Sequence, residues 1–234
     1  MMPDSFVENM QVSPEILLGR DLNETERKYS PKVLYVAGLM KYLGLGPRVS
    51  IVGTRNPTPE GRETARKLAA SLAREGIVVI SGLARGIDTE AHKGAMEISG
   101  GTMAGLGTPL DYFYPPENRD LQLKIRTEHI LVSQFPQSQP VQKRNFVIRN
   151  RTMALLCDAS IIVEAGDSSG TLSQGWEALR LGRPLFIWAP IFEAKGLDWP
   201  TQMVNFGAKR FSDASDVSTV FDEIPSKTMR LEVI

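Results

Sequence analysis

Cysteine and histidine are almost absent from this sequence of 234 residues, which contains one Cys and two His. A single cysteine excludes a disulfide framework and is typical of the reducing cytosol, so we expect a cytoplasmic protein. We expect Cys157 to be a buried small apolar residue, and His92 to make a structural hydrogen bond from the middle of a helix. One Cys and two His are too few for the common zinc sites, and we expect no metal.

An excess of positive charge and long apolar runs are also missing. The chain has 27 Lys and Arg against 27 Asp and Glu, which argues against a protein whose whole surface is basic. No stretch approaches about 18 consecutive apolar residues, so we expect no membrane span. No Gly-x-Gly-x-x-Gly follows a predicted strand, and no Gly-x-x-x-x-Gly-Lys-Ser/Thr occurs. These absences speak against a standard dinucleotide oxidoreductase and a P-loop hydrolase, and we expect no cofactor.

Short runs rich in Val and Ile alternate with helical patterns along most of the chain. The runs are almost continuously apolar, which favours strands that are covered on both faces. Strands and helices alternating at this spacing predict βαβ units and an α/β fold with a doubly wound, mostly parallel sheet. The predicted strands are Val49–Gly53, Ile77–Ser81, Thr102–Leu106, Ile130–Ser133, Ser160–Ala165 and Pro184–Ala189.

Three helices between these strands carry clear end signals. Pro59–Glu75 has Thr58 as its expected N-cap and a proline at the first helical position. Asp88–Ile98 is expected to be capped by Asp88 itself, and Gly170–Leu181 ends before a glycine.

One domain is expected over residues 31–225. Residues 1–30 are predicted to be a partly flexible leader, and residues 226–234 a C-terminal tail. Within the domain, Pro31–Gly38 and Lys209–Ser212 are candidates for extra edge strands.

Ligands of doubly wound sheets bind beyond the carboxyl ends of the strands, and three of these ends carry glycines, hydroxyls and arginines. Backbone N–H groups in such loops, and at the start of a helix, can hold a phosphate. Ordinary turns and helix caps also use these residues, so both interpretations stay open. The candidates are Arg55, Ser81, Gly82, Arg85, Gly86, Ser169, Gly170 and Thr171.

A basic segment supplies further candidates. Between Ile130 and Cys157 there is no Asp or Glu, whereas Lys143, Arg144, Arg149 and Arg151 are positive and Phe146 lies among them. Cations for phosphates and an aromatic ring for a base are the components of single-strand binding. The alternative is a solvated helix face with Phe146 in the core.

Several motifs in unbroken order resemble the DprA/Smf family of DNA-processing proteins. They are Gly53-Thr54-Arg55, the stretch from Ser81 to Asp88 with Ala91-His92, Tyr114-Pro115-Pro116-Glu117-Asn118-Arg119, Arg149-Asn150-Arg151, Glu164-Ala165, Ser169-Gly170-Thr171-Leu172, Gly182-Arg183 and Gly207-Ala208. The resemblance implies an extended Rossmann-like domain that binds single-stranded DNA, dimerises, and helps to load a RecA-type recombinase during natural transformation. In a chain of this length we expect neither of the additional helical and winged-helix-like modules of many family members.

Carried over to this sequence, the resemblance makes Arg55 and Lys143 phosphate contacts and Phe146 a base-stacking residue. It also makes Gly82, Arg85 and Gly86 a phosphate loop. Two positions depart from the family pattern: Val147 stands where a proline is common, and Ala189-Pro190 replaces Pro-Gly.

The leading hypothesis is a non-enzymatic binder of single-stranded DNA. One of Arg149 and Arg151 is expected to face the DNA, while the other braces the loops through Glu164 or Asp158.

Two alternatives stay open. A nucleotide-processing enzyme resembling the cytokinin-activating phosphoribohydrolases would use Arg151 and Glu177, although Gln174 stands where that pattern has Glu. A nucleotide-sensing module, for example in a defence system, would bind small nucleotides without turnover.

Overall fold

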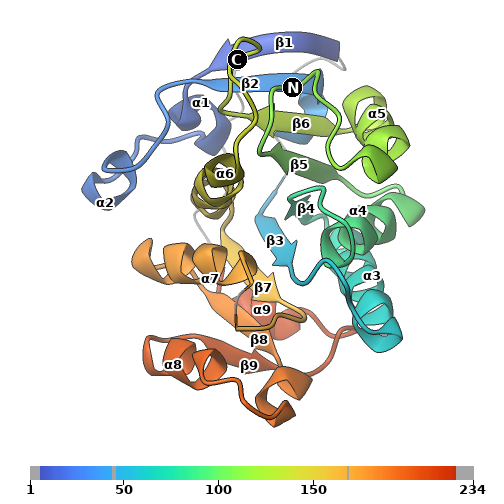
Figure 1. The fold of residues 1–234 in the computed structure, drawn as a ribbon, viewed down its shortest axis with the longest axis vertical. Coiled ribbons are helices and arrows are strands. Elements are labelled where there is room, and N and C mark those ends of the chain that lie inside the picture. The colour runs from blue at the N-terminus through green and yellow to red at the C-terminus, as the bar shows by residue number, and fades with distance from the viewer. Residues whose placement is uncertain (1–5, 44–45, 168, 225–234) are drawn as a thin grey trace.

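The sheet of this protein has nine strands within residues 6–43, 46–167 and 169–224, the part of the chain that the computed structural model describes (Figure 1). The strand order is β1-β2-β6-β5-β4-β3-β7-β8-β9. The pairs β1–β2 and β2–β6 are antiparallel and the remaining pairs are parallel, as the predicted doubly wound α/β fold requires. The strands are β1 Phe6–Val12, β2 Leu34–Leu39, β3 Arg48–Val52, β4 Val78–Ser81, β5 Thr102–Leu106, β6 Ile130–Ser133, β7 Ala159–Ile162, β8 Leu185–Trp188 and β9 Lys209–Phe211.

Helices cover both faces of the sheet, which explains why the strands are apolar without alternation. On one face, Val78 and Ile80 of β4 belong to a hydrophobic core that also contains side chains of α1, α6 and α8. On the opposite face, Val79 of the same strand belongs to a second core that also contains side chains of α3, α4 and α9. The helices are α1 Pro14–Leu18, α2 Glu24–Arg27, α3 Pro59–Arg74, α4 Ile87–Glu97, α5 Arg119–Glu128, α6 Lys143–Leu156, α7 Thr171–Arg180, α8 Trp199–Asn205 and α9 Ser218–Asp222. Among the described residues, no helix combines the length and the apolar content that crossing a membrane would need.

The start of α3 follows the prediction and the start of α4 does not. Thr58 caps α3, because its hydroxyl oxygen accepts a hydrogen bond from the Gly61 N–H at 3.0 Å. The N-cap of α4 is Gly86, whose φ is +80°, and the helix begins at Ile87. Asp88 therefore lies inside the first turn, and its carboxylate accepts from the Ala84 N–H at 3.3 Å in the preceding loop. The Asp88 carboxylate, which the sequence predicts to cap α4, instead accepts a hydrogen bond from the loop between β4 and α4.

The N-terminal part of the chain differs from the predicted leader. Residues 6–12 form β1, the edge strand, which pairs with β2, so β2 lies inside the sheet rather than at its edge. Backbone pairing decided this, because β1 has only one buried residue and little apolar periodicity. At the other edge, β9 confirms the predicted strand within Lys209–Ser212. The predicted tail, residues 226–234, lies outside the described residues.

Two predicted structural residues are fully buried, His92 on α4 and Cys157 at the end of α6. The Nδ1 atom of His92 lies 2.8 Å from the Thr102 hydroxyl oxygen and donates to it, because that hydroxyl itself donates to the Val79 carbonyl. The thiol of Cys157 is buried without a disulfide, and burial raises its pKa to about 12. Both residues therefore have the structural roles that the sequence predicted.

The buried histidines predict a stability that falls in mild acid. Burial lowers the pKa of His92 to about 3 and that of His129 to about 4. In the unfolded chain each ring titrates near about 6.5, so below this pH the unfolded state binds more protons than the folded state. Each histidine should then lower the free energy of unfolding by about 1.4 kcal/mol per pH unit until its folded pKa is reached.

Urea unfolding at about pH 7 and about pH 5 checks this expectation. The variant His92→Asn keeps a donor for Thr102 and removes the titrating ring. It should lose about half of the histidine contribution to the pH slope, since His129 supplies the other half. An unchanged slope in this variant would contradict the assignment.

Candidate nucleic-acid interface

Two adjoining cavities lie at the carboxyl ends of β3, β4 and β7, beneath the first turns of α6 and α7. Their volumes are about 440 Å³ and 190 Å³. They share a wall made of residues from three separate segments, Arg55, Ala84, Phe146 and Arg149. The larger cavity falls in the size range of small-ligand sites, and the strand ends are where doubly wound sheets bind their ligands.

The N-terminus of α7 closes one side of the larger cavity. Ser169, Gly170 and Thr171 line it, and the Thr171 hydroxyl donates to the Gly53 carbonyl at 2.9 Å. The Asn150 amide donates to the Gly170 carbonyl at 2.9 Å and so joins α6 to this loop. A helix N-terminus favours an anion, so this side of the cavity is suited to a phosphate.

The loop after β4 contributes less to the cavities than the sequence suggested. Gly82 and Arg85 line the smaller cavity, where Arg85 pairs with Glu117 at 3.5 Å. This exposed ion pair is weak, so Arg85 can exchange Glu117 for a phosphate. The Ala84 amide, however, is directed at Asp88. The Asp88 carboxylate thus accepts from a backbone N–H group of the loop that the sequence made a candidate for phosphate binding.

Ser81 and Gly86 have structural positions. The Ser81 side chain is fully buried, and its hydroxyl donates to the Ile51 carbonyl of β3 at 2.7 Å. Gly86 is buried as the N-cap of α4 and lines neither cavity. The prediction that the Ser81 hydroxyl faces a ligand is therefore corrected: it joins two strands of the sheet.

Arg149 forms the floor between the two cavities. It is 6% exposed, and its Nη1 donates to the Gly105 carbonyl at 2.9 Å. A Cβ atom at Gly82 would overlap the guanidinium, so only glycine lets the loop lie against it. Burial lowers the pKa of Arg149 and raises that of Asp88, and the opposite charge of each group counteracts the shift of the other.

The brace expected at Glu164 does not involve an arginine. Glu164 instead accepts from the backbone N–H and the hydroxyl of Thr58, both at 3.1 Å, at the start of α3. The buried contact of Arg149 is made with the strand carbonyl of Gly105, and the Arg151 guanidinium lies over the ring of Tyr29 at 5.3 Å. Arg149 thus faces the cavities and also braces the site.

Phe146 lines both cavities and is neither fully buried nor free on a solvated face. Its ring centroid lies 5.1 Å from that of Tyr114, with the planes tilted by 43°. A Cβ atom at Gly107 would lie 2.5 Å from the Phe146 ring, so the glycine leaves the space that the ring occupies. Tyr114 lines the smaller cavity and is 39% exposed, although the sequence analysis did not single out this ring as a site residue. Tyr114 could have been recognised as a site residue from its place in the Tyr-Pro-Pro-Glu-Asn-Arg motif.

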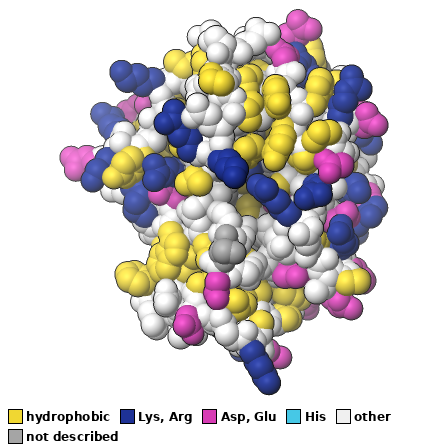
Figure 2. All heavy atoms as spheres, in the orientation of Figure 1, with side chains coloured by type: hydrophobic (Ala, Val, Ile, Leu, Met, Phe, Trp, Pro, Cys, Tyr) yellow, Lys and Arg dark blue, Asp and Glu magenta, His cyan; other side chains and the backbone are white. Residues whose placement is uncertain are grey.

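The other basic residues of α6 lie outside the cavities. Lys143, Arg144 and Arg151 are exposed, and none of the three has a carboxylate partner among the residues that the structure describes. Figure 2 shows Lys and Arg side chains gathered in a band across the middle of this face of the molecule. Of the basic residues of α6, only Arg149 therefore lines the cavities.

The residues of the hydrolase alternative are arranged differently. The Glu177 carboxylate is buried against Arg180, with N–O distances of 2.5 and 2.9 Å, and it lines neither cavity. Gln174 does line the larger cavity, where its amide donates to the Ser50 hydroxyl at 2.7 Å and its buried Oε1 has no hydrogen-bond partner. Within the described ranges, no three His, Cys, Asp or Glu side chains gather to hold a metal ion.

Comparisons with known proteins show which family the chain resembles. A family model for DNA recombination-mediator protein A matches residues 19–222. The chain is 33% identical over 201 residues to the DNA processing protein DprA of Bacillus subtilis, which covers 86% of this chain and 66% of that protein. It is 37% identical to DprA of Streptococcus pneumoniae, over 82% of this chain and 68% of that protein. With Protein Smf of Synechocystis it shares 37% identity, over 79% of this chain and 48% of that protein. The chain thus spans about half to two thirds of the length of these relatives.

Solved structures of similar proteins lead to the same family. The DprA structure from Streptococcus pneumoniae superposes with a TM-score of 0.76 at 30% identity, and covers 92% of this chain and 75% of that one. DNA processing protein A from Helicobacter pylori gives a TM-score of 0.74 at 27% identity, over 94% of this chain and 96% of that one. The family model, the identities over most of the chain and these two superpositions together show that the chain belongs to the DNA recombination-mediator protein A (DprA/Smf) family.

Proposed function

We propose that this chain binds single-stranded DNA through the two cavities and does not cleave it. The observation that carries the proposal is the shared wall, where Arg55, from the loop after β3, meets Phe146 and Arg149 of α6, which lie far from it in the sequence. The Helicobacter pylori relative, 27% identical, is described as having a unique single-stranded DNA binding mode, which supports the same ligand here.

The chemistry of the shared wall suits a single strand. The exposed Arg55 and the N-terminus of α7 would hold phosphates, while Phe146, beside Tyr114, would stack against a base. Lys143 and Arg144 on the first turn of α6 would contact phosphates outside the cavities. Arg149 would add a fixed positive charge from the floor. Such contacts read the backbone and the flat face of a base, so we expect little sequence preference.

The proposal of a binder rather than a hydrolase is supported by the position of Glu177. Its carboxylate is held by Arg180 outside the cavities, so it does not face a ribosyl group placed there. A dimer, a RecA-type recombinase as partner, a role in DNA uptake or recombination, and a cytoplasmic location remain predictions. Phe206, which is 72% exposed and packs edge-on against Trp176, offers one apolar surface for self-association.

The test is a titration of a labelled single strand at increasing salt. Because phosphate contacts release counterions, affinity should fall as salt rises, and Arg55→Gln should reduce the slope of log affinity against log salt by about 0.7. The matched control is Arg74→Gln, an exposed arginine at the opposite end of α3 from the cavities, which should leave the slope unchanged. Affinity that is independent of salt would contradict the proposal. Binding of AMP with release of adenine would favour the hydrolase.

A further inference from the structure

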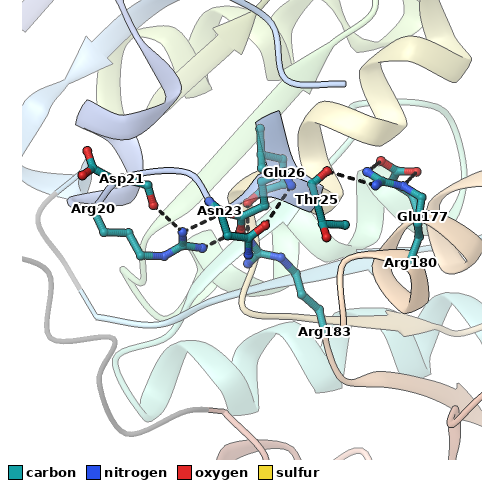
Figure 3. Close-up of polar contacts among 9 residues, drawn as sticks. Arg20, Asp21, Asn23, Thr25, Glu26, Glu177, Arg180 and Arg183 are labelled. Atoms are coloured by element: carbon teal, nitrogen blue, oxygen red, sulfur yellow. Dashed lines mark hydrogen bonds and ion pairs between the residues drawn. The ribbon is translucent and has the colours of Figure 1, made fainter. Parts of the chain in front are cut away.

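The segment before β2 is anchored to the ends of α6 and α7 by a buried carboxylate (Figure 3). Glu26 on α2 is 3% exposed and accepts from Arg20 at 2.6 and 2.8 Å and from Arg183 at 2.9 Å. Arg183 also donates to the Leu155 carbonyl near the end of α6, at 2.6 Å. These partly buried, charge-assisted bonds hold the residues that follow α2 at a defined place beside α6.

Tyr29 is presented on the surface immediately after this anchor. Its side chain is 47% exposed, and three cationic groups lie around its ring: Arg180 at 4.9 Å, Arg151 at 5.3 Å and Lys28 at 5.4 Å. The charge of Arg180 is balanced by Glu177. Neither Lys28 nor Arg151 pairs with a carboxylate of the described chain. The cluster of Lys28, Tyr29 and Arg151 therefore combines two unbalanced positive charges with an exposed aromatic ring.

This cluster continues the surface of the larger cavity. Val147, which is 44% exposed, lines that cavity, and Arg151 follows it one helical turn later on the same side of α6. Asn150, beside Arg151 in the chain, lines the cavity as well. A strand leaving the cavity past Val147 reaches Arg151 first and then Tyr29 and Lys28. The basic band in Figure 2 crosses this face of the molecule.

We propose that the Lys28–Tyr29–Arg151 cluster is a second contact site for single-stranded nucleic acid, occupied only by strands that extend beyond the two cavities. Lys28 and Arg151 meet phosphates, and the exposed part of the Tyr29 ring meets a base or sugar. The charge of the cluster fits a polyanion, and its ring fits the apolar faces of unpaired bases. This inference rests on the proposed function, because the cavities hold the part of the strand that leads to the cluster.

The test compares two strand lengths with the full chain. Lys28→Gln, Arg151→Gln and Tyr29→Ala should each weaken binding of a strand of about 25 nucleotides by roughly fivefold. This is the lower end of the effect expected when one contact to a base or phosphate is lost. Binding of a strand of about six nucleotides should change less than about twofold, since such a strand fills only the cavities. Lys28→Gln is the variant least able to disturb the fold, because its only described contact is the Tyr29 ring. Arg74→Gln again serves as the matched control.

The outcomes separate this inference from the proposed function. If the variants bind both strands as the parent does, or lose both equally, the cluster is not a second contact site, although the cavities still bind DNA. If the parent chain binds neither strand, the proposed function fails, and the cluster with it. A loss that is confined to the longer strand establishes the inference.

Discussion

Phe146→Ala is expected to weaken single-strand binding by roughly 10- to 100-fold, since each base stacked on an aromatic side chain contributes about 1–3 kcal/mol. The ring lines both cavities and lies against Tyr114, so its removal deletes the stacking surface on which the two cavities meet. Fluorescence anisotropy with a short labelled strand measures the loss, and thermal unfolding shows whether the fold is retained.

Two further variants sharpen this prediction. Gly107→Val keeps the Phe146 ring but places new atoms where that ring lies, so this variant should also weaken single-strand binding. Phe221→Ala removes a ring that is 46% exposed on α9 and lines neither cavity, and should leave affinity unchanged. If Phe146→Ala binds as tightly as the parent, Phe146 is a packing residue and the stacking role is wrong.

Arg149→Met is expected to lower the free energy of unfolding by about 3 kcal/mol or more at neutral pH, because it leaves a buried charge without its counter-charge. The Asp88 carboxylate loses the positive charge that opposes its desolvation, and the Gly105 carbonyl loses its donor. The folded-state pKa of Asp88, already raised by burial, should rise further. The loss of stability comes from the buried, ionised form of Asp88. The difference in free energy of unfolding between parent and variant should therefore shrink as pH is lowered through the folded-state pKa and the carboxyl becomes protonated.

Urea unfolding of the parent, Arg149→Met and Arg149→Met/Asp88→Asn at two pH values measures this coupling. The double variant should be more stable than the single one at neutral pH, since the amide carries no charge to desolvate. A stability deficit that stays constant with pH would show that Arg149 acts through packing and its bond to Gly105 rather than through Asp88. Single-strand affinity should also fall in Arg149→Met, because the floor of the cavities loses its charge.

Much of the fold could be predicted because its signals are local. The strands Thr102–Leu106 and Ile130–Ser133 have the predicted bounds, and Thr58 caps α3 as expected. Apolar runs, caps and terminating glycines act over a few residues, so they can be recognised in the chain itself. The edge strand β1 could not be recognised in this way, because its place depends on hydrogen bonds to β2, which lies more than 20 residues away in sequence.

The candidate site was predicted in part. Arg55, Phe146, Arg149 and the start of α7 meet at the cavities because the ends of parallel strands share one edge of the sheet. Ser81 has the right position in sequence, but its hydroxyl bonds to β3. The roles of side chains at a strand end depend on which neighbour is within about 3 Å, and only the packed structure sets these distances.

The sequence, with no net charge overall, determined that one segment, Ile130–Cys157, carries four basic residues and no acidic one, and that this segment precedes β7 of a doubly wound sheet. The tertiary structure decided how that segment is divided. Helix α6 places Phe146 and Arg149, which lie three residues apart and so on similar sides of the helix, against both cavities, and it leaves Arg144 and Arg151 exposed outside them. The tertiary structure also placed Tyr29 beside Arg151, because the hydrogen bonds of Glu26 hold the segment before β2 against the rest of the chain. The helical period can be recognised in the sequence. Which side of the helix packs against the sheet depends on contacts with segments that are distant in the sequence.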